Sequence, residues 1–190
     1  MRFGKIIKKG LALVTTLAMV VGVAGVNNSA TADAASSAKV RFNAYCYTAS
    51  GAWLAGDGST AKLAAKTVTV KKGKKVKVTI TIKGNASKGI GVLTIDAGNS
   101  TLSGGTPGVL KTFKKAKYSN VSVKCDGKKV SGIKYQQGEF EKTEGTNSWR
   151  LSLYNQWGSQ GDTTVTKCKA NATKIKFKKN CVISFSFTAS

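Results

Sequence analysis

Two tryptophans, an arginine and a tyrosine lie close together in residues 148–158, whose sequence is Ser-Trp-Arg-Leu-Ser-Leu-Tyr-Asn-Gln-Trp-Gly. If this stretch is a strand, alternate side chains point to opposite faces. Trp149 and the two leucines that follow it then face the core, whereas Arg150 and Tyr154 share a face open to water. The Asn-Gln-Trp-Gly end has the composition of a turn, so we expect Trp157 at a loop tip.

Trp157, Tyr154 and Arg150 predict a binding site for a polar ring such as a sugar. Rigid aromatic surfaces suit stacking on a pyranose face, and the guanidinium would donate hydrogen bonds. Trp53, in a glycine-rich loop, is a second candidate platform. A structural alternative stays open, in which Trp157 caps the end of the fold and Trp53 covers the core.

The sequence offers few candidate catalytic residues, because it contains no histidine and has only eight acidic residues. Glu139 and Glu141 are two residues apart and would share a strand face, and glycoside hydrolysis requires a carboxylate pair. The surrounding glycines and Lys142 are more typical of a solvated loop. Serine or cysteine nucleophiles would lack the usual imidazole base. We therefore predict no catalytic residues and a protein that is not an enzyme.

Metal binding has weak support in the sequence. Without histidine or a C-x-x-C motif, a zinc site is not expected. Asp57, Asp96, Asp126 and Asp162 could supply oxygen ligands to a structural calcium ion, although no local spacing indicates a site. We predict no cofactor and leave structural calcium open.

Four cysteines, Cys46, Cys125, Cys168 and Cys181, predict disulfide bridges, because an even count in an exported chain favours a disulfide framework. Three connectivities are consistent with the sequence.

Export is predicted by residues 1–34. Arg2 and three lysines precede an apolar run from Leu11 to Val26, and Ala-Asp-Ala at residues 32–34 forms an A-x-A cleavage site, which is the pattern of a signal peptide. A retained anchor is the alternative, but the run is shorter than the roughly 20 residues of a membrane-spanning helix. We expect a secreted, extracellular protein with no membrane span after cleavage and one domain at 35–190.

The chain is strongly basic, with 31 lysines and arginines and a net charge of +23. Beyond residue 34 only Arg41 and Arg150 are arginine. Lysine lacks the planar fork that reads guanine, which argues against sequence-specific nucleic-acid recognition. Lysines 174, 176 and 178 alternate with apolar residues and would share one face. That face is either merely solvated, discouraging edge pairing, or an electropositive surface for an anionic cell-wall polymer or mucin.

Short segments of period-two alternation, separated by turn residues, predict an all-β protein with eight to ten antiparallel strands in a sandwich or barrel. Residues 68–70 and 76–82 are expected to form a hairpin around 71–75. Asp126-Gly127 predicts a second, tight hairpin. The predicted core residues are Val78, Ile80, Leu151, Leu153, Phe185 and Phe187.

The order of these features resembles jelly-roll β-sandwich carbohydrate-binding modules of secreted Gram-positive bacterial proteins. The resemblance covers most of residues 39–188 and rests mainly on Tyr-Asn-Gln-Trp-Gly at 154–158 and Asp-Gly-Lys at 126–128. It implies a jelly-roll fold and a non-catalytic protein that binds a polysaccharide or other glycan. The basic charge and the four cysteines depart from that family's pattern.

Overall fold

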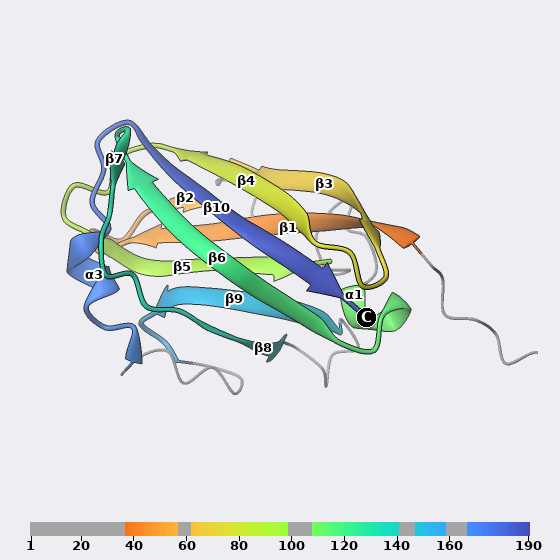
Figure 1. Ribbon diagram of the computed structural model, residues 1–190. Helices are drawn as coiled ribbons and strands as arrows, with labels where there is room; N and C mark the ends of the chain where they lie inside the picture. Colours follow the sequence, from red (N-terminus) through yellow and green to blue (C-terminus); the bar gives the residue numbers. More distant parts are fainter. Residues whose placement is uncertain (1–36, 57–61, 99–107, 141–146, 159–166) are drawn as a thin grey trace, which may run out of the picture. The chain divides into compact units, whose positions relative to one another are not determined.

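Two antiparallel β-sheets, here called sheet A and sheet B, pack face to face in the computed structural model (Figure 1). The structure describes residues 37–56, 62–98, 108–140, 147–158 and 167–190. Sheet A has the order β2 (Trp53–Ala55), β1 (Ser37–Thr48), β5 (Ile90–Ala97), β9 (Ser148–Asn155), β8 (Gln136–Phe140), with β3 (Ala64–Lys71) also paired to β1. Sheet B has the order β4 (Val76–Lys83), β10 (Asn180–Ala189), β6 (Ala116–Cys125), β7 (Lys128–Lys129). The predicted all-β sandwich is confirmed, and the jelly-roll connectivity stays a prediction.

The core lies between the sheets and follows the period-two pattern of the sequence. In β4, for example, Val78, Ile80 and Ile82 are buried, whereas the lysine and threonines that alternate with them are exposed. All six predicted core residues are at most 3% exposed. Burying alternate side chains removes apolar area from water at one face of each strand, and this is what selects the sandwich over separate sheets.

Tyr118 of β6 ties the two sheets together. Its ring is fully buried and lies 5.0 Å from the Phe187 ring and 5.1 Å from the Phe185 ring, in edge-to-face geometry. Its hydroxyl reaches sheet A, where it donates to the carbonyl oxygens of Ile95, at 3.2 Å, and Trp149, at 3.0 Å. Burial, reinforced by the nearby Asp96 carboxylate, raises the pKa of Tyr118 well above its ordinary value, so the hydroxyl remains a donor.

The connections correct one hairpin prediction and confirm the other. Residues 68–70 and 76–82 do not pair: β3 pairs with β1 in sheet A, and β4 pairs with β10 in sheet B. The lysine-rich turn at 71–75 therefore crosses between sheets, and alternation within each strand could not reveal its partner. Asp126-Gly127 does form the tight β6–β7 hairpin, with φ values of 49° and 81°.

Helical structure in the described residues includes two single turns, α1 (Val109–Thr112) and α3 (Asn171–Lys174). None of the helices found there has the length and apolarity needed to cross a membrane. The predicted signal peptide, residues 1–34, lies outside the described residues and stays a prediction.

The disulfide prediction is wrong for this structure, because the four cysteines are buried and no disulfide bond joins any two of them. Cys46 belongs to sheet A and Cys168 precedes α3. Cys125 and Cys181 face each other across β6 and β10, but their side chains share a hydrogen bond rather than a covalent bond. An even cysteine count reports composition, whereas bridging depends on the placement of each pair.

Replacing Tyr118 by phenylalanine should lower the free energy of unfolding by about 1–2 kcal/mol, since the carbonyls of Ile95 and Trp149 lose a buried donor while the ring packing survives. Urea denaturation of both proteins measures this difference. An unchanged midpoint would show that the hydroxyl does not tie the sheets together.

Cys125 should be the most reactive thiol of the folded protein. The hydrogen bond from Cys181 lowers the pKa of Cys125, whereas burial raises the pKa of Cys46 to about 12. Because the thiolate is the nucleophile, iodoacetamide at about pH 8 should modify Cys125 first, and peptide mapping by mass spectrometry identifies the site. Earlier labelling of Cys46 or Cys168 would contradict this assignment.

Candidate functional site

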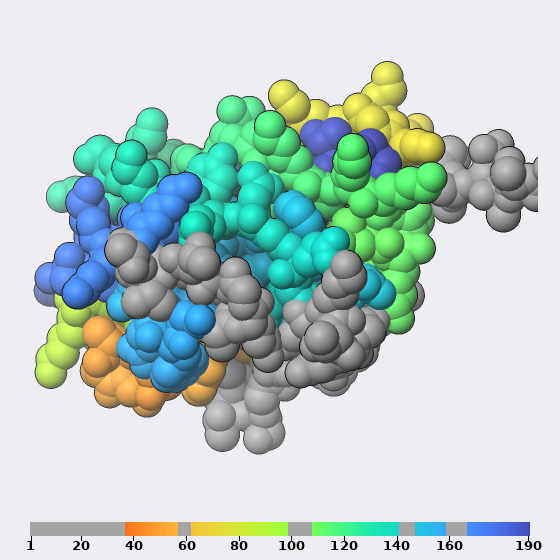
Figure 2. All heavy atoms as spheres, turned by 90° about the horizontal axis from the view of Figure 1, so that it is seen from below, coloured from red at the N-terminus to blue at the C-terminus, as the bar shows by residue number. Residues whose placement is uncertain are grey.

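Three aromatic side chains, Tyr47, Trp53 and Trp157, form an exposed cluster that we call the aromatic patch. The ring centroids of Tyr47 lie 5.1 Å from Trp53 and 5.2 Å from Trp157, and the two tryptophans are 6.0 Å apart. Trp53 is 40% exposed and Trp157 is 55% exposed. In Figure 2 the orange surface of the β1–β2 region adjoins the light-blue surface at the end of β9. Exposed apolar side chains gathered in one place mark interaction surfaces.

The β1–β2 hairpin sets the positions of Tyr47 and Trp53. The two residues are cross-strand partners, and the ladders of β1 are irregular on both sides of Tyr47, toward β2 and toward β5. Such bulges redirect side chains and are common beside functional sites. Thr48 closes the hairpin, because its backbone N–H donates to the Ala52 carbonyl at 2.8 Å and its hydroxyl oxygen accepts from the Ala52 N–H at 2.9 Å.

Trp157 is held by a local turn at the end of β9, as the sequence predicts. The side-chain oxygen of Asn155 accepts the backbone N–H of Trp157 at 3.0 Å, and Asn155 itself is buried. An asparagine that bonds to the backbone two residues on is a standard turn former. The buried asparagine therefore fixes the backbone from which Trp157 projects.

Gln156 lies over Gly91, which gives the patch a polar edge. The Gln156 backbone N–H donates to the Gly91 carbonyl at 2.8 Å. A Cβ atom added at Gly91 would lie 2.6 Å from the Gln156 side-chain oxygen and 3.1 Å from the Tyr47 ring. Glycine is therefore required at position 91 for the amide and the ring to approach the strand this closely.

The patch can bind a ring by stacking and orient it by hydrogen bonds. The exposed Gln156 amide, the Tyr47 hydroxyl and the two indole N–H groups are donors at the patch, and the amide and hydroxyl oxygens are acceptors. Aromatic faces combined with a few polar groups are what a sugar with alternating C–H and O–H surfaces requires.

The structure does not bring Arg150 together with Trp53 and Trp157 in the aromatic patch, and its role as a ligand-binding residue stays a prediction. Its guanidinium forms a two-pronged ion pair with Asp96, with nitrogen–oxygen distances of 2.6 Å and 2.7 Å. The guanidinium carbon lies 3.0 Å from the centroid of Phe140 and 5.9 Å from that of Tyr45. A buried pair of this kind strongly destabilises the fold when one partner is removed, so the fold depends on Arg150.

The face of sheet A that carries Arg150 is buried and polar rather than wet. Arg150 is 9% exposed and Ser152 is 2% exposed. Asn43 continues the row, because it is the register partner of Asp96. Within the described residues, the buried amide of Asn43 has no hydrogen-bond partner. The predicted core positions Leu151 and Leu153 of β9 are therefore confirmed, but the face that carries Arg150 is not open to water.

Tyr154 and Trp149 both pack against the core. Tyr154, a predicted stacking residue, lies opposite Leu93 and packs against the core, and the ring contacts of the patch join Tyr47, Trp53 and Trp157 without it. Trp149 is partly buried, and its indole N–H donates to Gln137 at 3.1 Å. Tyr47 replaces Tyr154 as the third ring. Its signal in the sequence is its place just before the turn that presents Trp53.

The aspartates proposed for calcium do not assemble into a site in the described part of the chain. Asp96 is paired with Arg150, and both oxygens of Asp126 accept backbone N–H groups of residues 178–180. No group of three potential metal ligands occurs among the described residues. Asp57 and Asp162 lie outside them, as does Glu141 of the rejected catalytic pair.

Comparison with protein-family models, with curated proteins and with solved structures finds no match. The function must therefore be inferred from the fold and from the residues of the site.

Truncation of Trp149 and of Trp157 to alanine should have opposite effects. Trp149→Ala should lower the free energy of unfolding by about 3 kcal/mol, because it opens a cavity and removes the bond to Gln137. Trp157→Ala should change stability by about 0.5 kcal/mol or less, because a mostly exposed side chain is removed. Thermal melting of both variants is the measurement. Early melting of Trp157→Ala would favour the structural alternative, in which this tryptophan caps the fold.

Proposed function

We propose that the protein is a secreted, non-catalytic carbohydrate-binding protein that holds a glycan on its aromatic patch. The exposure of Trp53 and Trp157 beside Tyr47 is the observation that carries the proposal. Two indole rings that stay in contact with water do not contribute the favourable free energy of burying apolar surface. A ligand that covers them would gain this free energy on binding.

The chemistry of the patch favours binding over turnover. Stacking surfaces and neutral hydrogen-bonding groups hold a sugar without activating it. Of the predicted ligand residues, Trp157 and Trp53 lie in the patch, while Arg150 is paired with Asp96 and Tyr154 packs against the core. The resemblance to carbohydrate-binding modules of secreted bacterial proteins and the predicted signal peptide support the same reading, with a polysaccharide outside the cell as partner.

Binding through the aromatic patch should depend on Trp157 and hardly on salt. A glycan array and pull-down on insoluble polysaccharides identify the ligand at about 0.01 M and about 1 M salt, where the screening length falls from about 30 Å to about 3 Å. Trp157→Ala should then weaken binding at least about tenfold, a loss of about 1.4 kcal/mol.

Leu63→Ala is the matched control, because Leu63 is 53% exposed and is not one of the three stacked rings. It should bind like the unaltered protein. Equal affinity of folded Trp157→Ala and Leu63→Ala proteins would refute binding at the patch, and loss of all binding at high salt would point to charge instead of stacking.

A further inference from the structure

An open pocket of about 410 Å³ lies where β6 turns into β7, and lysines surround it. Cys125 and Val130 contribute apolar lining, and Ser131 adds a hydroxyl. Four lysines complete the lining: Lys128, Lys129, Lys174 and Lys176. We call this the lysine pocket. It belongs to sheet B and its neighbouring loop, so it shares no residue with the aromatic patch.

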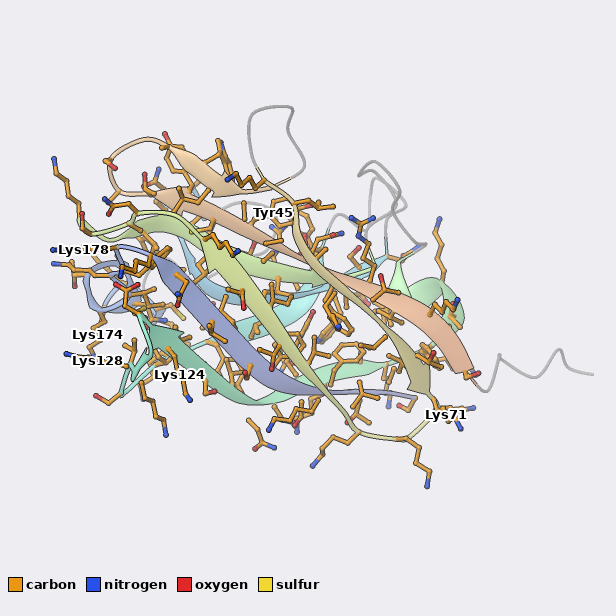
Figure 3. The ribbon with its side chains drawn as sticks, turned by 90° about the horizontal axis from the view of Figure 1, so that it is seen from above. Tyr45, Lys71, Lys124, Lys128, Lys174 and Lys178 are labelled. Carbon is orange, nitrogen blue, oxygen red and sulfur yellow. The ribbon has the colours of Figure 1, made fainter. Side chains whose placement is uncertain are left out.

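The lysines of this region gather at one end of the fold. Figure 3 shows Lys124, Lys128, Lys174 and Lys178 together at that end and Lys71 at the opposite one. The four pocket lysines are exposed. The nearby Asp126 carboxylate, whose oxygens accept the backbone N–H groups of residues 178–180 at 2.7–2.9 Å, offsets one positive charge against the four pocket lysines. The pocket therefore concentrates positive charge.

Hydrogen bonds hold the segments that carry these lysines. Asp126 joins the β6–β7 hairpin to the chain before β10. Asn171, fully buried, donates to the carbonyls of Lys134 and Leu153, both at 2.6 Å, and so fixes α3 beside β9. The backbone N–H of Lys176 lies near the Cys125 thiol and helps to lower its pKa. A cationic site held in place in this way loses less entropy when a ligand binds.

We propose that the lysine pocket binds an acidic sugar residue of a polyanionic glycan. Lysine ammonium groups recognise negative charge without the fixed fork that arginine offers to phosphate. This freedom of geometry suits anionic ester groups, such as sulfate, that occur at variable positions on a sugar ring. Val130 and Cys125 give the ring an apolar surface. The described lining contains no aromatic side chain, whereas proteins that bind single-stranded nucleic acid combine basic grooves with aromatic stacking platforms. The site is separate from the aromatic patch.

The test compares a dextran sulfate oligosaccharide with an unsulfated dextran oligosaccharide of the same length. At physiological salt the sulfated probe should bind, and the variant Lys128→Gln, Lys174→Gln, Lys176→Gln should raise its Kd at least about tenfold. The matched control is Lys71→Gln, Lys72→Gln, Lys74→Gln in the turn between β3 and β4. It removes the same charge far from the pocket and should change the Kd about threefold or less.

Equal weakening in both triple variants would overturn the proposal, because binding would then follow net charge alone. A single-stranded DNA oligonucleotide of equal charge is the second competitor. If the oligonucleotide binds as tightly as the sulfated probe, and if the pocket variant no longer binds it, the partner is nucleic acid. Repeating the comparison in Trp157→Ala separates the two sites, since the pocket should bind the sulfated probe unchanged there.

Cys125 gives a readout that requires no lysine substitution. Because it lines the pocket, a saturating amount of the sulfated oligosaccharide should slow its modification by iodoacetamide at least about threefold in the unaltered protein, as expected when more than about two-thirds of the pocket is occupied. The unsulfated oligosaccharide should leave the rate unchanged. An unchanged rate with bound sulfated probe would place that probe outside the pocket and overturn the assignment.

Discussion

The contact of Tyr118 with both sheets is the constraint on which the rest of the fold depends. Its ring packs among Phe42, Phe185 and Phe187, and its hydroxyl reaches two carbonyls of the opposite sheet. Ring packing is tolerant of small shifts, but a donor that must reach carbonyls about 3 Å away fixes how far apart the sheets sit and how they are aligned. The alignment of the strand ends of the two sheets follows from this.

Local patterns predicted what depends on local physics. The core residues of β4, β9 and β10 could be identified from alternation because burial on one face is a property of each strand by itself. The turn that presents Trp157 could be identified because Asn155 bonds to the backbone two residues away. Pairing was different: β3 and β4 have the alternation and turn of a hairpin, yet each pairs with a strand from another part of the chain.

The candidate site shows the same division. Trp53 and Trp157 could be selected by residue type and by their loops, but 104 positions of sequence separate them, and only the folded chain brings Tyr47 between them. The ion pair of Arg150 could not be predicted, because its partner Asp96 lies on a strand 54 positions earlier. The cysteines were misassigned for a related reason: their even number is visible in the sequence, and their placement in two sheets and a loop is not.

One loop connects the surroundings of the aromatic patch and the lysine pocket. The backbone of Gly84 and Ala86 donates to the carbonyls of Lys179 and Phe177, beside the pocket lysines, and the Gly89 carbonyl accepts the N–H of Ala49 in the hairpin of Tyr47 and Trp53. Both surfaces therefore lie at the end of the sandwich where β4, β1 and β9 finish. Salt hardly weakens stacking on the aromatic patch, whereas it weakens the attraction of the pocket lysines for negative charge. A glycan chain with neutral and acidic residues would therefore bind the two surfaces through chemically independent contacts. Its avidity would depend on the spacing between the two surfaces, which this loop holds fixed.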